Sequence, residues 1–218
     1  MLETAAAAPL RLQLWLSPGF PTGAFAWSHG LEAAVAEGRL GSAAETRDWL
    51  AFLLARGSGW NDLVLFAEGY RAAADPARLV ETVDLARALA GSRERRAEIL
   101  ALGEAFALAV APWDAAIPGD APYPIAVALA AARSGIPLGQ ALVAFAGAFA
   151  ANLVSAAVRL VPLGQTGATL ILRELEPAIL AAAARAAASS PYDLGSAATL
   201  SDIAAMRHET LRTRLFRS

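Results

Sequence analysis

The stretch that decides the fold of this chain is IPLGQALVAFAGAFAANLVSAAV, Ile136 to Val158, in which no residue carries a charge. It is long enough to cross a bilayer as a helix, which takes about 20 apolar residues. However, Gln140, Asn152 and Ser155 are polar, and the many small residues favour membrane insertion far less than leucine or isoleucine would. In a soluble protein, a helix that is apolar all round lies in the core. We therefore predict a buried central helix and keep a membrane-associated helical protein as an alternative.

Helix start signals recur along the rest of the chain. Ser42 and Glu45 form a capping-box pattern. Asp75 precedes a proline suited to the first helical position, and Ser92 is a further candidate cap. A surface loop rich in Pro and Gly is expected from Pro112 to Pro124. Because no stretch alternates as a strand would, we predict an all-α fold, a single compact domain of about eight to ten helices around a central apolar helix with no significant sheet.

The chain divides into three parts by composition. We expect residues 1–11 to be a flexible N-terminal segment, residues 12–191 a helical domain and residues 192–218 a partner-binding C-terminal tail. Four arginines crowd the end of this tail: Arg207, Arg212, Arg214 and Arg217. The tail is either a binding segment for a partner or simply the last helix of the domain, with cations complementing its dipole.

Composition excludes several classes of function. The formal net charge of -2 gives no support to nucleic-acid binding. The chain has no cysteine, which excludes disulfides and thiolate metal sites within it. No signal peptide is apparent, so we expect a cytoplasmic protein. Hydrophobic residues make up 56% of the chain, more than the usual 45–50%, which favours tight helix packing or a protein partner.

The segment from Leu12 to Gly38 has the pattern of a recognition surface. Two Pro/Gly turns, at 17–19 and 21–23, interrupt an otherwise apolar stretch, and a helix carrying Ser28, His29 and Glu32 is expected to follow. Gly30 would let another backbone come close to this helix. The alternative is a structural N-terminal loop held down by two tryptophans, and spacing alone favours that interpretation.

Ser28, His29 and Glu32 also suggest two kinds of chemistry. Adjacent helical positions point about 100° apart, so Ser28 and His29 would not face each other as nucleophile and base. With two histidines and no cysteine, a closed metal site would need carboxylates or a second subunit. A small all-α hydrolase or metal-binding protein that uses these three residues stays as an alternative.

Four blocks of the sequence occur in an order typical of one family. They are S-P-x-x-P-x-G-x-F-x-x-S-x-G-L-E from Ser17 to Glu32, then Ser92-Arg93-Glu94 with Arg96, then Ser155 to Gln165 with RLVPLGQ, and finally MRHETLRTRLFRS from Met206 to Ser218. From residue 12 to its end, the chain resembles the UreF family of urease accessory proteins. Two departures stand out: Ala168-Thr169 replaces a common Gly-Gln pair, and His29 stands where the family often has Gln.

The resemblance implies an all-α homodimer with no cofactor and no catalytic activity of its own. It implies a urease maturation adaptor, a chaperone of nickel insertion that works with the UreD/UreH scaffold and the UreG GTPase on apo-urease. Such an adaptor acts by binding one nucleotide state of the GTPase better than the other. Arg93 is then either an arginine finger toward the GTPase's phosphates or an ion-pair partner of Glu94.

Carried onto this chain residue by residue, the resemblance implies two sets of partner-binding residues and a set of structural turns. On the GTPase side or the dimer surface it places Ser28, Gly30, Glu32, Arg93 and Glu94. On the scaffold side it places Arg207, His208, Glu209, Arg214, Phe216 and Arg217. The turns are Pro18, Pro21, Gly23, Pro162, Gly164 and Gln165. No catalytic residue and no metal ligand is assigned.

Overall fold

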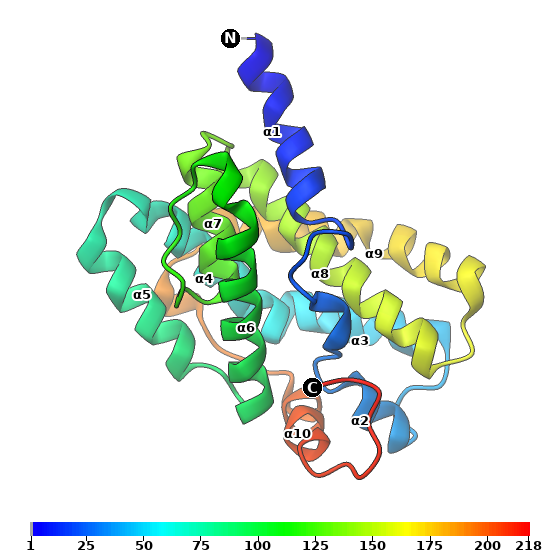
Figure 1. Cartoon of the computed structure of the whole chain (residues 1–218). Coiled ribbons are helices and arrows are strands. Elements are labelled where there is room, and N and C mark those ends of the chain that lie inside the picture. The colour runs from blue at the N-terminus through cyan, green and yellow to red at the C-terminus, as the bar shows by residue number, and fades with distance from the viewer. Residues whose placement is uncertain (1) are drawn as a thin grey trace.

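The uncharged stretch folds into α8, Leu138–Leu160, in a computed structural model that describes residues 2–218. Across a short turn, α8 packs along α9, Gly164–Ala187 (Figure 1). Although α8 is long and apolar enough to cross a membrane, half of its most apolar window is buried inside the protein. Phe145 points into the core, whereas Val143 is 37% exposed. The predicted central helix is therefore present, with one face in the core and another at the surface.

Within residues 2–218 the chain is all-helical, as predicted, with ten α-helices and no strand. The first of them, α1 (Leu2–Trp15), projects from the body of the molecule (Figure 1). Residues 2–11, where we expected a flexible segment, belong to this helix, and Met1 lies outside the described residues. Trp15 anchors the end of α1, because its ring is buried and meets the ring of Phe106 edge-on at 6.4 Å.

Three side chains cap helices where the sequence predicts it. Each accepts hydrogen bonds from backbone N–H groups of the first turn, which have no partner within the helix. The pairs are Ser42 with α3 (Ala43–Arg56), Asp75 with α5 (Pro76–Ala88) and Ser92 with α6 (Arg93–Val110). The cap at Ser92 sets the charged first turn of α6 beside the C-terminal helix.

The remaining long helices enclose the core. The helices α4 (Ser58–Arg71) and α7 (Tyr123–Arg133) lie deepest in the core and pack on each other. Around them, α6 packs on α7, and α3 packs on α9. The loop predicted at Pro112–Pro124 is present as residues 111–122 between α6 and α7; it begins with a short 3-10 turn, Ala111–Trp113, and the last two predicted loop residues, Tyr123 and Pro124, open α7 instead.

The C-terminal tail packs against this helical body. Trp60 Nε1 donates to the carbonyl of Asp193 at 2.8 Å. Further along, α10 (Thr199–His208) lies against α2 (Leu31–Ala36), at the end of the molecule opposite the projecting N-terminus (Figure 1). The last ten residues, 209–218, form a loop that returns to the segment before α2, and we call them the final loop.

Candidate protein-docking site

The segment before α2 does not form the helix predicted for Ser28 and His29. The helix begins only at Leu31, because His29 (φ 53°) and Gly30 (φ 77°) adopt left-handed backbone conformations. Ser28 Oγ accepts a hydrogen bond from the N–H of Glu32 at 3.3 Å, which satisfies one free donor of the helix start. The segment is therefore a specified turn that places Glu32 at the first turn of α2.

Gly30 provides the close backbone approach predicted from the sequence, and the approaching backbone is α10. A Cβ atom at this position would lie 2.6 Å from the backbone nitrogen of Ala205. This distance leaves no room for a side chain, so α10 can cross α2 here only over a glycine.

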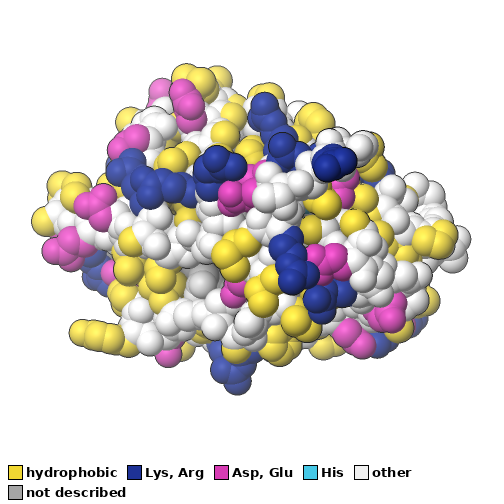
Figure 2. Space-filling view, turned by 90° about the horizontal axis from the view of Figure 1, so that it is seen from below, with side chains coloured by type: hydrophobic (Ala, Val, Ile, Leu, Met, Phe, Trp, Pro, Cys, Tyr) yellow, Lys and Arg dark blue, Asp and Glu magenta, His cyan; other side chains and the backbone are white. Residues whose placement is uncertain are grey.

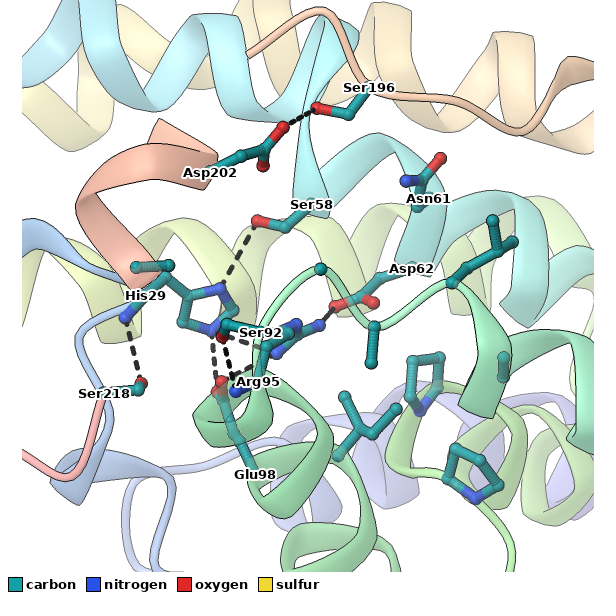
Figure 3. A pocket seen from close by; sticks show the side chains of 18 of the residues that line it. His29, Ser58, Asn61, Asp62, Ser92, Arg95, Glu98, Ser196, Asp202 and Ser218 are labelled. Atoms are coloured by element: carbon teal, nitrogen blue, oxygen red, sulfur yellow. Dashed lines mark hydrogen bonds and ion pairs between the residues drawn. The ribbon is translucent and has the colours of Figure 1, made fainter. Parts of the chain in front are cut away.

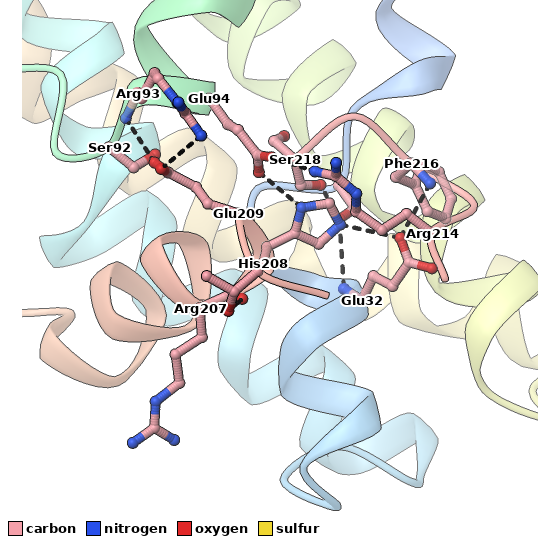
Figure 4. A network of polar contacts seen from close by, with 12 residues as sticks. Glu32, Ser92, Arg93, Glu94, Arg207, His208, Glu209, Arg214, Phe216 and Ser218 are labelled. Carbon is pink, nitrogen blue, oxygen red and sulfur yellow. Dashed lines mark hydrogen bonds and ion pairs between the residues drawn. The ribbon is translucent and has the colours of Figure 1, made fainter. Parts of the chain in front are cut away.

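His208, the last residue of α10, lies between two acidic residues from different helices (Figure 4). The residue is fully buried. Its Nδ1 lies 2.7 Å from Glu94 Oε2 at the start of α6, and its Nε2 lies 3.0 Å from Glu32 Oε2 in α2. Arg214 Nη1 donates to the other oxygen of Glu94 at 2.5 Å. Three helices and the final loop therefore meet at one imidazole.

Glu32 is the residue that holds the final loop most directly. Its carboxylate accepts the backbone N–H of Leu215 at 2.7 Å and that of Phe216 at 3.0 Å. Burial acts to raise the pKa of Glu32, but the two N–H groups and His208 outweigh it, and the pKa lies below its ordinary value. Glu32 is consequently charged at neutral pH.

Arg159, in the last turn of α8, is a positioning residue that the sequence analysis did not assign to the site. Its guanidinium lies 4.2 Å from the ring centroid of the buried Phe216, and its Nη2 donates to the carbonyl of Phe25 at 2.6 Å. Arg159 thus ties the final loop to the turn segment near residue 25. Its place in the RLVPLGQ block was the available signal in the sequence.

The structure brings the two predicted sets of partner-binding residues together in one cluster. Glu32 and Glu94 from one set hold His208 and Arg214 from the other. Arg93 contacts Glu209, with the guanidinium Nη2 3.4 Å from Oε2 and the backbone N–H donating to Oε1 at 2.8 Å. The expected pair of Arg93 with Glu94 does not form in the described structure, because Glu94 binds His208 and Arg214 instead.

Exposure divides the cluster into a support and a surface. The buried members hold the fold together; they are Ser28, Gly30, Glu32, His208 and Phe216. The exposed side chains around them form what we call the basic face: Arg93, Met206, Arg207, Arg212, Arg214, Leu215 and Arg217. Figure 2 looks onto this end of the molecule and shows arginines in several groups among acidic and hydrophobic side chains.

The predicted turn residues lie outside this cluster. Gly23 (φ 77°) and Gly164 (φ 62°) adopt the left-handed conformation that favours glycine. The others are exposed: Pro18, Pro21, Pro162 and Gln165.

A second buried network lies behind the turn segment and involves His29 (Figure 3). His29 Nε2 is 2.7 Å from Glu98 Oε1, and Arg95 on the same helix as Glu98 bridges that carboxylate to Asp62 of α4. Burial raises the pKa of Asp62 despite the opposing effect of Arg95 and His29. For Glu98, His29 and Arg95 outweigh burial and lower the pKa to about 2. Cavities of about 110 Å³ and 140 Å³ are both lined by these four residues, which the sequence analysis had not grouped.

Comparison with known proteins identifies the family. A model of the UreF family matches residues 40–176. The urease accessory protein UreF of Brucella ovis is 52% identical over 213 residues, covering 96% of this chain and 93% of the relative. The protein of that name in Agrobacterium fabrum is 49% identical and covers 99% of both chains. The chain belongs to the UreF family.

Membership of the UreF family decides between the alternatives left open by the sequence. The family consists of urease accessory proteins, so the expectation that the chain is not itself an enzyme is confirmed by its relatives. In the structure these three residues have separate partners: Ser28 donates to the carbonyl of Ser218, His29 pairs with Glu98 and Glu32 pairs with His208. Within residues 2–218, no group of three or more His, Asp or Glu residues is arranged to hold a metal ion.

Proposed function

We propose that this UreF-family chain is a urease maturation adaptor that joins the UreD/UreH scaffold and recruits the UreG GTPase. In this proposal the adaptor couples the nucleotide cycle of the GTPase to delivery of nickel into apo-urease, in the cytoplasm. The observation that carries the proposal is the basic face, which is mounted on the ionic network around the fully buried His208. The relatives' name, urease accessory protein, supplies the process to which this face contributes.

The chemistry of the basic face fits an acidic protein surface. Arginine guanidinium groups form two-pronged hydrogen bonds with carboxylates and bury well at interfaces. Arg93 and Arg207 have side chains that are 80% and 58% exposed, and Leu215 adds an apolar group that is 69% exposed. Such a mixture of cationic and apolar groups is typical of protein interfaces. We therefore assign scaffold and GTPase binding to this end of the molecule.

We also propose that the chain forms a homodimer through α1 and α8. A groove of about 880 Å³ lies between the two helices, and all the residues that line it are uncharged. Leu10 and Leu14 of α1 are 55% and 43% exposed beside it. A second copy that covered this apolar face would remove it from water. Light scattering measures the molar mass of the wild type and of Val143→Glu. We expect a dimer for the wild type and a monomer for Val143→Glu, and a dimer in both would contradict an interface at α1 and α8.

Binding assays with purified partners test the adaptor proposal. The double variant Arg207→Glu with Arg212→Glu reverses two exposed charges of the basic face without removing a member of the buried network. We expect capture of the scaffold or the GTPase to weaken about tenfold or more, which corresponds to about 1.4 kcal/mol. Arg173→Glu, which reverses one exposed arginine on α9 away from the basic face, is the control for a charge reversal elsewhere on the surface. Equal capture by all three proteins would contradict the proposal.

A further inference from the structure

The cavity of about 110 Å³ lies between residues 89–92, which connect α5 to α6, and the C-terminal tail (Figure 3). Its floor is the ionic network of His29, Asp62, Arg95 and Glu98, and none of the residues that line it belongs to the basic face. A water molecule needs about 10–15 Å³ of such space. The cavity therefore has room for a group larger than one water molecule.

Two buried side chains of this cavity have hydrogen-bonding capacity that the protein itself does not use. Asp62, which is 7% exposed, binds Arg95 through one carboxylate oxygen, as Figure 3 shows. Its other oxygen, Oδ1, accepts no hydrogen bond within residues 2–218. Ser201 of α10, which is 8% exposed, makes no side-chain hydrogen bond in that part of the chain either. Because buried polar groups nearly always have a partner, we expect a molecule in the cavity to supply the missing ones.

The charges around the cavity favour a cation. Three carboxyl groups line it, those of Asp62, Glu98 and Asp202, against the single guanidinium of Arg95. When all three are ionised, the net charge is -2, or -1 if His29 is protonated. The other lining residues, including the one contributed by the final loop, have no charged side chain. Such a concentration of one sign of charge in a cavity attracts the opposite sign.

Two of these carboxyl groups are not fully compensated by the protein. Asp202 is half-buried, and within the described residues it forms no ion pair and accepts only the hydroxyl of Ser196, at 2.8 Å. Burial raises the pKa of Asp62 although Arg95 and His29 act to lower it. A cation beside these two groups would stabilise their charged forms.

The arrangement of acceptors fits an ammonium group better than a metal ion or a guanidinium. Within residues 2–218 no group of three or more acidic or histidine side chains is arranged to hold a metal ion. The free acceptors come from α4 and α10, and no single carboxylate faces the cavity with both oxygens free, as a guanidinium fork would need. An ammonium ion is a compact charge with three donors. Apolar side chains that could pack on an aliphatic stem line the same cavity: Leu65, Leu89 and Ile99.

We propose that this cavity binds a primary ammonium group on an aliphatic chain, the group that a lysine side chain carries. In the bound state the ammonium group donates to Asp62 Oδ1, the Ser201 hydroxyl and Asp202, while its stem lies against the apolar wall. This inference goes beyond the adaptor proposal, because the site shares no residue with the basic face.

Nuclear magnetic resonance of the full chain tests the site with a soluble model of a lysine residue, Nα-acetyl-lysine methylamide. At neutral pH its amine is protonated, since the ordinary lysine pKa is about 10.4. We expect millimolar additions to cause saturable shifts in amides at the cavity, such as those of Asn61, Gly91 and Ala205. Nα-acetyl-norleucine methylamide has an aliphatic stem but no amine and should cause none. Absence of saturable shifts with the lysine derivative, or equal binding of the two probes, would overturn the proposal.

Two substitutions remove polar groups of the cavity and leave the ionic network of its floor in place. Asp202→Asn keeps an oxygen that can accept from Ser196 but loses the charge, and Ser201→Ala removes a hydroxyl that has no partner in the protein. We expect binding of the lysine derivative to weaken about tenfold in Asp202→Asn and about fivefold in Ser201→Ala. Asp48→Asn, at an exposed aspartate of α3, is the matched control and should bind as the wild type does. Equal affinities of the wild type and Asp202→Asn would overturn the proposal.

Capture assays with the purified partners then identify the source of the ammonium group. If a lysine of the scaffold or the GTPase occupies the cavity, Asp202→Asn should weaken capture of that partner and Asp48→Asn should not. If capture is unchanged while the lysine derivative binds the wild type, the source is a free amine. The probe experiment needs no partner, so its failure is distinguishable from failure of the adaptor proposal.

Discussion

Gly30 and Ala205 bring α2 and α10 into direct backbone contact. The two helices are separated by most of the sequence, and a Cβ atom on Gly30 would lie 2.6 Å from the Ala205 nitrogen and 2.9 Å from its Cα. This contact sets the distance at which His208, three residues beyond Ala205, can reach Glu32. The support of the basic face therefore depends on a residue with no side chain.

The variant Gly30→Ala should be much less stable than Gly38→Ala. Both glycines have positive φ, 77° and 71°, so each substitution carries a similar backbone cost of about 1–2 kcal/mol. Only at Gly30 does the new methyl group meet another backbone, since nothing lies within 4 Å of a Cβ at Gly38. Urea unfolding of both variants measures the difference. Equal losses of unfolding free energy in the two variants would show that α10 can move away from Gly30 without cost.

The Glu98→Gln variant should change the acid sensitivity of the protein. The pKa of Glu98 is lowered to about 2 in the folded state, below its value of about 4.3 in the unfolded chain. Its charge therefore stabilises the fold fully above about pH 4.3, and this contribution is lost as the pH falls toward 2. Asp62, with a raised pKa, acts in the opposite direction and offsets part of this loss.

We expect Glu98→Gln to be less stable at neutral pH by about 3–5 kcal/mol, because Arg95 and His29 lose a buried partner. Its stability should also fall less steeply between about pH 4.3 and pH 2. Urea unfolding at stepped pH measures both effects. Glu176→Gln, an exposed carboxylate on α9, is the control with the same change of charge. If the free energy of unfolding fell with pH as steeply in Glu98→Gln as in the wild type, the lowered pKa of Glu98 would not be its cause.

Removal of the Arg93 side chain tests whether this residue acts on a partner's nucleotide. Its guanidinium is largely exposed and makes only a 3.4 Å contact with Glu209, so it is available to a partner. If Arg93 were an arginine finger, Arg93→Ala would lower stimulated GTP turnover by about 10³-fold or more while binding was retained. We expect a smaller effect, on binding alone, because Arg93 belongs to the charged surface that we propose as the docking site. A GTPase assay at saturating adaptor distinguishes the two results.

Phe216→Ala should loosen the final loop, whereas Leu215→Ala should not. Phe216 is 4% exposed and lies under the guanidinium of Arg159, while Leu215 is 69% exposed. Burial of a phenylalanine side chain stabilises by about 1.5–3 kcal/mol. Limited digestion with trypsin, which cleaves after Arg212 and Arg214, measures release of the loop. Similar cleavage rates in the two variants would show that Phe216 is not the anchor.

Much of the fold could be predicted from the sequence, because the relevant signals act over a few residues. Ser42, Asp75 and Ser92 cap the helices that follow them, since a cap needs only its own first turn. The same local reasoning was wrong for Ser28 and His29. There the spacing of apolar residues suggested a helix, but left-handed conformations at His29 and Gly30 delay its start to Leu31.

The sequence by itself therefore determined the helical class, the central helix, the helix starts after Ser42, Asp75 and Ser92, and the family, because helix periodicity, caps and motifs depend on neighbouring residues. Only the tertiary structure decided that the two predicted sets of partner-binding residues form one cluster. His208 lies 114 residues from Glu94 and 176 residues from Glu32 along the chain. Pairing over such separations follows from how α2, α6 and α10 pack, and no local pattern encodes which distant charge will satisfy a buried imidazole.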